Sequence, residues 1–327
     1  MSAPPRTEAP YTAVVTGGTS GIGAKCVDAM MARARSGDAS GAPSHIVIPC
    51  RDVDRARRDL EARWASGGAP RVEFAAIDLA DLGTVKAFAA WLASTAEARP
   101  RVTKLVCCAG VQTRPALSKQ GYEVTFAVNH LAHYLLIRLL EPLMARPARV
   151  VVVASGTHDP SKHTGVPAPR WRGRDLLRID DTLAGKGVAG ALAAAQVAYS
   201  TSKLCNVMCA YALSREYAAA GKDIAVVACD PGLVPGTGLV RDLPAAVRVV
   251  ASLLRFLVPL INLQQFSQTA AQAGSGVAAL ALDAEFARAT GAYFQGTREI
   301  PSSPESRDAD KQRELVGLSE EVVAGFL

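Results

Sequence analysis

Short hydrophobic runs rich in β-branched side chains alternate along this chain with longer amphipathic segments. The short runs are typical of buried strands, and they cover residues 13–16, 46–50, 72–77, 102–107, 150–154 and 224–229. The amphipathic segments are typical of helices, and they cover residues 22–34, 52–64, 82–96, 122–144 and 197–219. Such alternation favours right-handed βαβ crossovers. The pattern therefore predicts an α/β fold with one doubly wound parallel sheet and helices on both faces.

No linker or internal repeat divides the 327 residues, so we expect a single domain over residues 1–327. Residues 1–10 are polar and proline-rich, and they predict a flexible tail that is neither a signal nor a transit peptide. Residues 243–263 are strongly apolar, but Arg248, Arg255 and Pro259 interrupt them. This argues against a membrane span and favours a substrate lid over residues 236–266, with contact to a membrane surface left open.

The composition of the chain argues against several classes of function. The formal net charge is +6, but the basic residues are scattered and form no tail, which argues against nucleic-acid binding. A mildly basic surface suits an anionic cofactor. The seven cysteines include no Cys-x-x-Cys pair, and the five histidines show no metal-ligand spacing. We therefore expect reduced thiols, no metal site and a cytoplasmic location.

A glycine-rich loop directly follows the first predicted strand and precedes the first predicted helix. It reads Thr16-Gly17-Gly18-Thr19-Ser20-Gly21-Ile22-Gly23. Glycines in such a turn let the backbone approach a pyrophosphate closely, and the helix N-terminus then faces the phosphate charge. The alternative is a plain glycine-rich turn, but the strand–loop–helix context argues against it. The loop predicts a dinucleotide site on a Rossmann-type sheet.

The glycine spacing resembles the loop of the short-chain dehydrogenase/reductase family. That loop is Thr-Gly-x-x-x-Gly-x-Gly, and it is matched by Thr16, Gly17, Gly21 and Gly23. The resemblance extends from about residue 12 to the C-terminus. By this resemblance Asp78 contacts adenine. The implied cofactor site further includes Thr19, Ser20, Ile22, Leu79, Ala109, Gly110, Tyr199, Lys203, Pro231 and Gly232.

The end of the second strand indicates which cofactor is bound. An acidic residue there would bind the ribose hydroxyls of NAD, whereas a basic one would pair with the 2′-phosphate of NADP. By resemblance, Cys50 takes the position of the acid, and Arg51 follows it. A planar guanidinium suits a phosphate, so we expect NADP(H) rather than NAD(H). The alternative is a surface arginine paired with Asp52 or Asp54.

Tyr199 and Lys203 lie four residues apart and so share one helix face. A free tyrosine, with a pKa of about 10, is a poor acid–base catalyst at neutral pH. A nearby ammonium favours the phenolate and lowers that pKa. The alternative is a surface helix pair. Following a glycine loop, the spacing favours proton transfer by Tyr199 with Lys203 as its partner.

The resemblance assigns two further catalytic residues. Ser155 follows the fifth predicted strand, where it would orient the substrate oxygen, and Asn129 would hold a proton-relay water. A helix or turn cap is the alternative for Ser155. The chain departs from the family at Cys108, where a thiol replaces a bracing amide. It also carries a long segment before Tyr199, so we expect residues 156–198 to form an insertion or flap beside the substrate.

The chain resembles two branches of the family most. Cys50-Arg51-Asp52, Asn129-His130-Leu131 and residues 290–294 are similar to the retinol dehydrogenase-like enzymes. Residues 199–206, the long insertion and residues 318–321 are similar to the light-dependent protochlorophyllide reductases, in which Cys107 would match a proposed proton donor. A buried strand thiol is the alternative that the apolar run favours.

The function expected from these features is an NADP(H)-dependent oxidoreductase that transfers a hydride to or from a bulky apolar carbonyl or alcohol. The first alternative is light-dependent NADPH:protochlorophyllide oxidoreductase, for which a plastid location would follow. The second, of another class, is a cofactor-binding scaffold without catalysis. The partner is then a small apolar molecule, and the long helices would allow the homo-oligomeric faces that the family uses.

Overall fold

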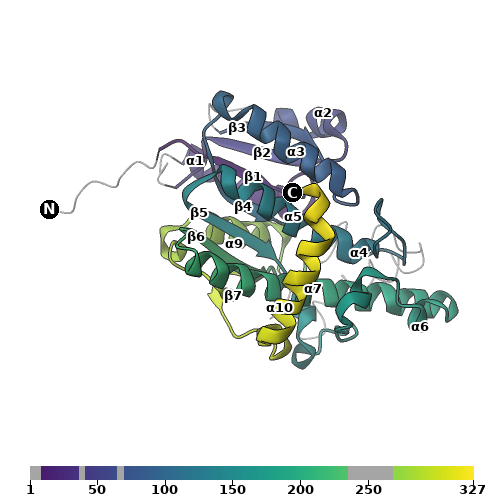
Figure 1. The fold of residues 1–327 in the computed structure, drawn as a ribbon. Coiled ribbons are helices and arrows are strands. Elements are labelled where there is room, and N and C mark those ends of the chain that lie inside the picture. The colour runs from purple at the N-terminus through teal and green to yellow at the C-terminus, as the bar shows by residue number, and fades with distance from the viewer. Residues whose placement is uncertain (1–8, 37–40, 65–69, 235–267) are drawn as a thin grey trace.

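The computed structural model describes residues 9–36, 41–64, 70–234 and 268–327, and Figure 1 shows them as coloured ribbons. They form an eight-stranded sheet in the order β3-β2-β1-β4-β5-β6-β7-β8. Neighbouring strands from β3 to β7 are parallel, and β8 pairs antiparallel with β7. The strands are β1 Thr12–Val15, β2 His45–Cys50, β3 Arg71–Ala76, β4 Val102–Cys107, β5 Met144–Val153, β6 Ile224–Asp230, β7 Ala292–Gln295 and β8 Arg298–Glu299. The predicted doubly wound α/β sheet is confirmed.

The helices cover both faces of the sheet, as Figure 1 shows. They are α1 Gly21–Arg35, α2 Val53–Trp64, α3 Leu82–Ser94, α4 Val124–Phe126, α5 Ala132–Leu140, α6 Asp181–Ala184, α7 Gly187–Ala219, α9 Ala270–Leu282 and α10 Ala309–Val323. Helices α1, α2 and α9 pack on one face, and α3, α5 and α7 pack on the other. The helix α9, strands β7 and β8, and helix α10 lie beyond the last element that the hydrophobic pattern predicted.

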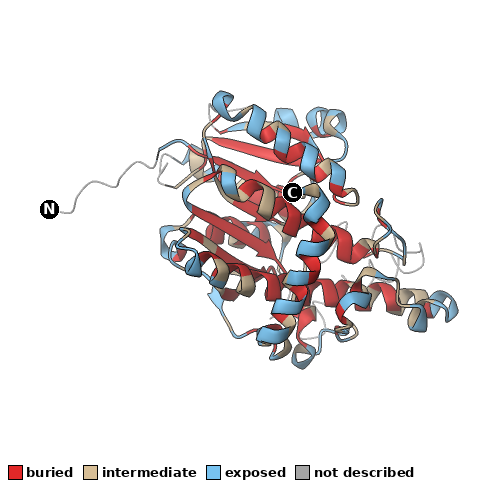
Figure 2. Cartoon of the chain, viewed as in Figure 1, coloured by how far each residue is buried: buried red, intermediate tan, exposed pale blue. Residues whose placement is uncertain are grey.

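Strict alternation of side chains divides the core into two layers. In β1, Val14 packs into the layer under α3, α5 and α7, whereas Ala13 and Val15 pack into the layer under α1 and α9. Strand β5 repeats this arrangement, with Val150 and Val152 in one layer and Val151 and Val153 in the other. Successive side chains of a strand point to opposite faces, so a strand covered on both sides is apolar throughout. Figure 2 accordingly shows the central strands in red.

The helix predicted over residues 122–144 is shorter and interrupted. Residues Ala127–Leu131 form a π-helical turn between α4 and α5, and the Ala132 N–H donates to the Ala127 carbonyl, five residues back. Helix α5 ends at Leu140, and Met144 already belongs to β5. A π-helical turn contains only about one residue more than an α-helical turn. The spacing of hydrophobic residues therefore cannot reveal it.

The segment expected to form an insertion or flap, residues 156–198, is partly helical. Helix α7 begins at Gly187, ten residues before the predicted start, so it absorbs the last part of residues 156–198. The remainder forms short helical turns, including Gly156–His158, Pro160–Lys162 and Gly173–Leu177, together with α6. The expected lid over residues 236–266, and residues 1–8 of the expected tail, lie outside the described residues.

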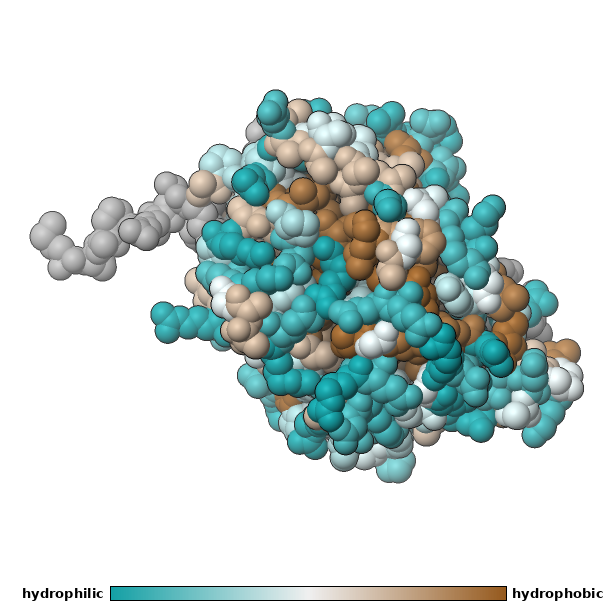
Figure 3. Space-filling view, in the orientation of Figure 1, coloured by the Kyte–Doolittle hydropathy of each residue, from teal (hydrophilic) through white to brown (hydrophobic). Residues whose placement is uncertain are grey.

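The face seen in Figure 3 is largely hydrophilic, with hydrophobic side chains gathered in a broken band near the C-terminal helix. Across the described part of the chain, the large hydrophobic side chains classed as exposed are Leu117, Val188, Leu233 and Leu327. No helix within that part is both long and apolar enough to cross a membrane. The expected contact with a membrane surface stays a prediction.

Helices α1 and α9 cross in close contact, and a glycine allows it. A Cβ on Gly274 would meet Lys25 Cβ at 2.4 Å and the Cys26 backbone nitrogen at 2.6 Å. Backbone atoms of α1 cannot move aside as the end of a side chain can. Gly276 lies in the same helix, but a Cβ there would meet nothing nearer than 3.6 Å. A comparison of substitutions at Gly274 and Gly276 therefore separates the effect of steric crowding from the effect of helix propensity.

We expect Gly274→Ala to lower the free energy of unfolding by about 1–3 kcal/mol, because overpacking at the helix crossing outweighs the gain in helix propensity. Gly276→Ala is the matched control, and it should be neutral or stabilising by up to about 1 kcal/mol. Urea unfolding followed by circular dichroism measures both. Equal effects of the two substitutions would show that α1 and α9 are not in close contact.

Candidate functional site

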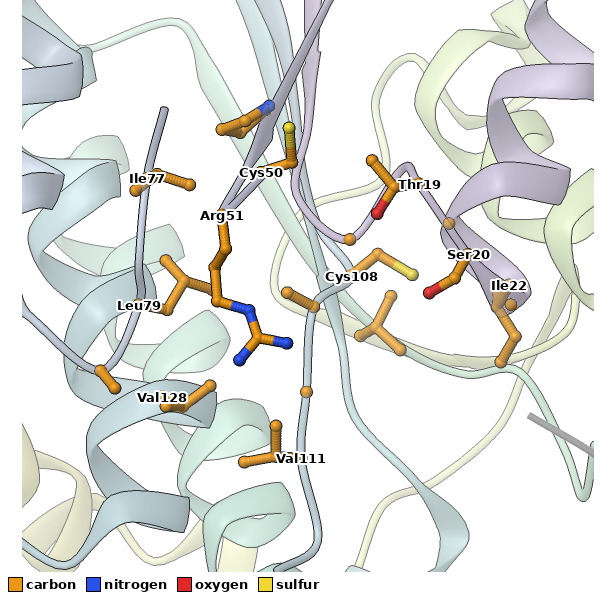
Figure 4. Close-up of a pocket in the computed structure, with 18 of the residues that line it drawn as sticks. Thr19, Ser20, Ile22, Cys50, Arg51, Ile77, Leu79, Cys108, Val111 and Val128 are labelled. Atoms are coloured by element: carbon orange, nitrogen blue, oxygen red, sulfur yellow. The ribbon is translucent and has the colours of Figure 1, made fainter. Parts of the chain in front are cut away.

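A cavity of about 410 Å³ opens at the carboxyl ends of the parallel strands, between the N-terminus of α1 and the middle of α7. The strand order reverses here, because β1 lies between β2 and β4, and this is where ligands bind in open α/β sheets. Figure 4 shows side chains from several strand ends converging on it. The predicted site residues that line the cavity are Gly17, Thr19, Ser20, Gly21, Ile22, Gly23, Arg51, Asp78, Leu79, Ala109, Gly110, Tyr199, Lys203 and Pro231.

The glycine loop is closed so tightly that side chains are excluded at Gly17 and Gly23. A Cβ on Gly23 would lie 2.3 Å from the Gly17 carbonyl oxygen, and Gly17 itself has a φ of +69°. The loop ends at Ser20, the N-cap of α1, whose hydroxyl makes no capping bond within the described residues. The first N–H groups of α1 therefore remain available to an anion in the cavity.

Thr16 fixes the loop to the neighbouring strand rather than lining the cavity. Its hydroxyl accepts hydrogen bonds from the backbone N–H groups of Cys108, at 2.9 Å, and Ala109, at 3.1 Å. It also lies 2.9 Å from Nε2 of His133, whose Nδ1 faces the Asn129 carbonyl at 3.1 Å. Because Nδ1–H donates to that carbonyl, Nε2 accepts from Thr16. A hydroxyl thus braces β1 against β4, where the family's amide is replaced by Cys108.

Arg51 is exposed at the end of β2, and Figure 4 shows its side chain extending into the cavity. Among the described residues it forms no ion pair, whereas Asp52 caps the following helix by accepting from the Arg55 N–H at 2.9 Å. Arg51 therefore does not pair with Asp52 or Asp54, which was the alternative expectation. A guanidinium without a carboxylate partner suits a phosphate.

Tyr199 and Lys203 lie on one face of α7 and are almost fully buried, with 8% and 3% of each residue exposed. Burial raises the pKa of Tyr199, a hydrogen bond from Ser155 lowers it, and the charge of Asp230 raises it. Burial also lowers the pKa of Lys203 to about 8, although nearby Cys108, Cys229 and Asp230 oppose this. Lys203 Nζ donates to the Val153 carbonyl at 3.0 Å and lies 5.5 Å from the centre of the Tyr199 ring.

Ser155 is adjacent to Tyr199 and combines the two roles considered for it. Its side chain hydrogen-bonds with Tyr199. It is also the N-cap of the Gly156–His158 turn and accepts from the Thr157 N–H at 3.3 Å. The Ser155 hydroxyl therefore faces Tyr199, and its oxygen also accepts the hydrogen bond that caps the turn.

Asn129 is fully buried in the π turn, and its side chain is fixed on three sides. Its Oδ1 accepts from the Val111 N–H at 2.8 Å, and its Nδ2 donates to the Val111 carbonyl and the Ser202 hydroxyl, both at 2.9 Å. Ser202 in turn donates to the Tyr199 carbonyl at 2.7 Å. The amide group thus connects the strand-end loop to α7. Its assignment to a relay water stays a prediction.

Four predicted residues, Thr16, Ser155, Asn129 and Gly232, support the cavity from outside its lining. Sequence reasoning missed other lining residues, chiefly Pro49, Cys50, Ile77, Cys108, Val111, Thr113, Ala116, Val124, Val128, Val153 and Ala154. Several of these sit at strand ends, which was the available signal. The rest come from residues 111–128, where only the chain path determines which side chains reach the cavity.

Cys107 and Cys108 point to different environments, as alternation along β4 requires. Cys107 is 1% exposed and packs in the core under α5 and α7, where burial raises its pKa. Cys108 lines the cavity, and burial raises its pKa to about 11 against the lowering effect of Lys203. Both thiols are therefore protonated at neutral pH.

Comparison with known proteins agrees with this geometry. The family described as short chain dehydrogenase matches residues 11–166, and the AcuH dehydrogenase domain matches residues 238–324. The WW domain-containing oxidoreductase of Homo sapiens is 30% identical over 313 residues, which cover 95% of this chain and 67% of that protein. Chloroplastic protochlorophyllide reductase B of Hordeum vulgare is 27% identical over 333 residues, which cover 95% of this chain and 78% of that protein.

A solved structure shows the same fold. The putative NAD(P) dependent gluconate 5-dehydrogenase from Beutenbergia cavernae, determined with bound NADP, is 25% identical. Its TM-score is 0.60, and the match covers 90% of this chain and 97% of that chain. These matches confirm the family that the glycine loop indicated: the chain belongs to the short-chain dehydrogenase family and is an oxidoreductase.

Proposed function

We propose that this protein is an NADP(H)-dependent oxidoreductase that transfers a hydride to or from a bulky apolar carbonyl or alcohol. The observation that carries the proposal is one continuous cavity. It runs from the N-terminus of α1, past Arg51, to the buried Tyr199 and Lys203. Within the described residues, Ser20 makes no capping bond at that N-terminus and Arg51 forms no ion pair. A phosphate-binding end, a guanidinium and a proton-transfer pair thus face the same space.

The residues present fit a dinucleotide. A Cβ at Gly17 or Gly23 would collide with backbone, so the loop is shaped for close approach, and a cavity of about 410 Å³ lies against it. Gly17 to Gly23 and the α1 N-terminus would hold the pyrophosphate, Arg51 the 2′-phosphate and Asp78 the adenine. When bound, the nicotinamide supplies or accepts the hydride.

Tyr199 would give or take the proton at its hydroxyl. Because burial alone raises its pKa, it needs stabilisation of the phenolate form, and the Ser155 hydrogen bond supplies part of this. Ser155 would also orient the substrate oxygen. Lys203 can add a positive charge if its ammonium turns from the Val153 carbonyl toward the cavity. Asn129 would hold a relay water, which stays a proposal drawn from the family.

The substrate class rests on apolar side chains of the cavity lining, among them Val111, Val124 and Val128. Two exposed hydrophobic residues, Leu117 and Leu233, also lie close in sequence to the lining residues Ala116 and Pro231. Such side chains support an apolar substrate. The same class would include protochlorophyllide, and the match to a plant protochlorophyllide reductase supports that alternative. Cys107 argues against it, because it packs in the core and does not line the cavity.

A scaffold without catalysis is the remaining alternative. The intact arrangement of Tyr199, Lys203 and Ser155 argues against it. We further propose that residues 1–327 form one domain in which residues 236–266 cover the substrate. Association into homo-oligomers and contact with a membrane surface stay proposals.

The first test is NADPH consumption by the purified protein with retinal-like and steroid-like carbonyls and protochlorophyllide, in the dark and under light. We expect dark turnover of a carbonyl. Tyr199→Phe should reduce kcat by about 10³-fold or more, because the proton donor is removed. It should change the Kd for NADPH by less than about threefold, measured by fluorescence titration.

Turnover of protochlorophyllide only under illumination would instead establish the photoenzyme. Activity that survives Tyr199→Phe would contradict the proton-transfer role. Tight NADPH binding without turnover of any substrate in the panel would favour the scaffold.

Arg51→Ala should raise the Kd for NADPH by about 10- to 100-fold and leave the Kd for NADH nearly unchanged, because a charge-assisted contact to the 2′-phosphate is lost. Arg58→Ala, at an exposed position of α2 that does not line the cavity, is the matched control. Fluorescence titrations with both cofactors measure the ratio. Equal changes for NADPH and NADH would assign phosphate recognition to another residue.

NADPH affinity should fall as the pH rises through about 8. Burial lowers the pKa of Lys203 to about 8, so the ammonium that can bind the cofactor is lost above that pH. The Kd then rises by at most about tenfold per pH unit. Titrations from pH 6.5 to 9.5 test this, with Lys203→Met expected to remove the dependence. If the Kd for NADPH rose equally with pH in the wild-type protein and in Lys203→Met, the titrating group would be a residue other than Lys203.

A further inference from the structure

His158 is a buried histidine next to the active site that the mechanism above does not use. It ends the short turn Gly156–His158, which follows Ser155 directly, and its exposed fraction is 0%. The edge of its ring meets Tyr293 of β7, with ring centres 4.9 Å apart and an interplanar angle of 67°. It therefore lies between the catalytic strand end and the C-terminal part of the chain.

Both ring nitrogens of His158 have defined partners. Nδ1 lies 2.7 Å from the Ser155 carbonyl oxygen, and Nε2 lies 3.2 Å from the backbone nitrogen of Ser303. A backbone N–H can only donate, so Nε2 must accept, and the ring proton must sit on Nδ1. The imidazole is thus held as the neutral Nδ1–H tautomer, which donates to Ser155 and accepts from Ser303.

Protonation would break this arrangement, because Nε2–H and the Ser303 N–H would then face each other as two donors. Burial lowers the pKa of His158, against the opposing effects of its contact with Ser155 and the charges of Asp159 and Asp230. Lys162 lowers it further. The ring is therefore neutral under physiological conditions.

The Ser303 end of this connection is itself firmly held. Ser306 donates to the Ser303 carbonyl at 2.7 Å, and Gln312 Nε2 of α10 donates to the Ser306 carbonyl at 2.6 Å. The hydroxyls of Ser302 and Tyr211 of α7 lie 2.7 Å apart. These serines and Gln312 are at most 3% exposed. A buried polar network of this kind fixes a backbone position because each broken bond would leave an unpaired group.

On the strand side, the Ser155 end is held by the Ala154 N–H, which donates to the Cys229 carbonyl at 2.7 Å, and beyond Ser155 its other bonds belong to the turn. Its carbonyl also accepts from the His158 N–H at 3.2 Å, and its hydroxyl accepts from the Thr157 N–H at 3.3 Å. Both bonds are local to the turn and move with it. The contact to Nδ1 is the shortest of the three, and through the ring it reaches a segment far away in the sequence.

We propose that His158 is a positioning residue that ties the Ser155 backbone to the C-terminal segment at Ser303 and thereby sets the Ser155 hydroxyl against Tyr199. The proposal rests on the proposed function, because it requires Ser155 to act in the reaction. Catalytic groups tolerate little displacement, since a shift of about 1 Å can cost about 10²-fold in rate. A C-terminal segment joined to the serine through one ring would hold it within such limits.

Two substitutions separate the halves of this connection. In His158→Asn the side-chain amide nitrogen takes the place of Nδ1, so the bond to Ser155 can be kept while that to Ser303 is lost. In His158→Gln the amide takes the place of Nε2, so Ser303 keeps its partner and Ser155 loses its donor. Because the connection needs both bonds, we expect kcat to fall by about 10- to 100-fold in each variant.

The double variant Ser155→Ala/His158→Gln shows whether the effect passes through Ser155. If it does, His158→Gln causes no further loss of kcat once Ser155 is replaced. The assay is NADPH oxidation with the most active carbonyl of the panel, and the Tm and the Kd for NADPH show that each variant is folded. A variant that loses one of the two bonds but keeps the wild-type kcat, or a Gln effect that persists with Ser155→Ala, would overturn the proposal.

Two readouts do not depend on turnover. Hydrogen exchange of the peptide that contains Ser155 should accelerate in both variants, because each frees the Ser155 backbone from the C-terminal segment. In the wild-type protein, ¹H–¹⁵N correlations of the His158 ring, assigned through its Cβ, should show the neutral Nδ1–H form at pH 7. An Nε2–H tautomer or an imidazolium would overturn the proposal even if no variant folds. If Ser155→Ala alone has no effect on kcat, the proposed role of Ser155 fails instead.

Discussion

The site depends first on one hydroxyl, that of Thr16, which joins β1 to β4 at the point where the strand order reverses. It accepts from two successive N–H groups of the chain leaving β4 and donates to His133 of α5. The glycine loop, the β4 end and the helix behind them are thereby held together. The ladder already joins the two strand ends, because the Thr16 N–H donates to the Val106 carbonyl at 3.0 Å. The hydroxyl adds partners for the two N–H groups beyond β4, which the ladder leaves unpaired.

The second constraint is the burial of charge on α7. Lys203 is nearly inaccessible, and an isolated buried ammonium is costly unless it is hydrogen-bonded. The Val153 carbonyl supplies a partner, and the nearby carboxylate of Asp230 favours the charged form. The same burial that lowers the pKa of the lysine raises the pKa of the tyrosine, so the pair is tuned by its surroundings as much as by its spacing.

Asn129 and His158 illustrate how buried side chains join distant segments around this site. The Asn129 amide links the chain after β4 to Ser202 on α7, beneath Tyr199. His158 links the chain after β5 to the C-terminal segment. Both work through backbone groups, and both are fully buried, so their substitution would disturb geometry without removing a reacting atom. The position of the reacting side chains thus follows from contacts between segments distant in sequence.

Local patterns in the sequence determined the fold class and the main chemical groups. Alternation of apolar runs and amphipathic segments predicts the parallel sheet, since a strand covered on both faces must be apolar throughout. The glycine spacing and the Tyr199–Lys203 spacing are likewise local, because one turn or one helix face carries each of them. Only the tertiary structure decided the π turn at Asn129, the lack of an ion pair at Arg51 among the described residues, and the inclusion of residues 187–198 of the expected insertion in α7. It also decided that Cys107 faces the core, and it joined His158 to Ser303. These features depend on which distant backbone groups meet, and hydrophobic periodicity within one segment carries no information about that.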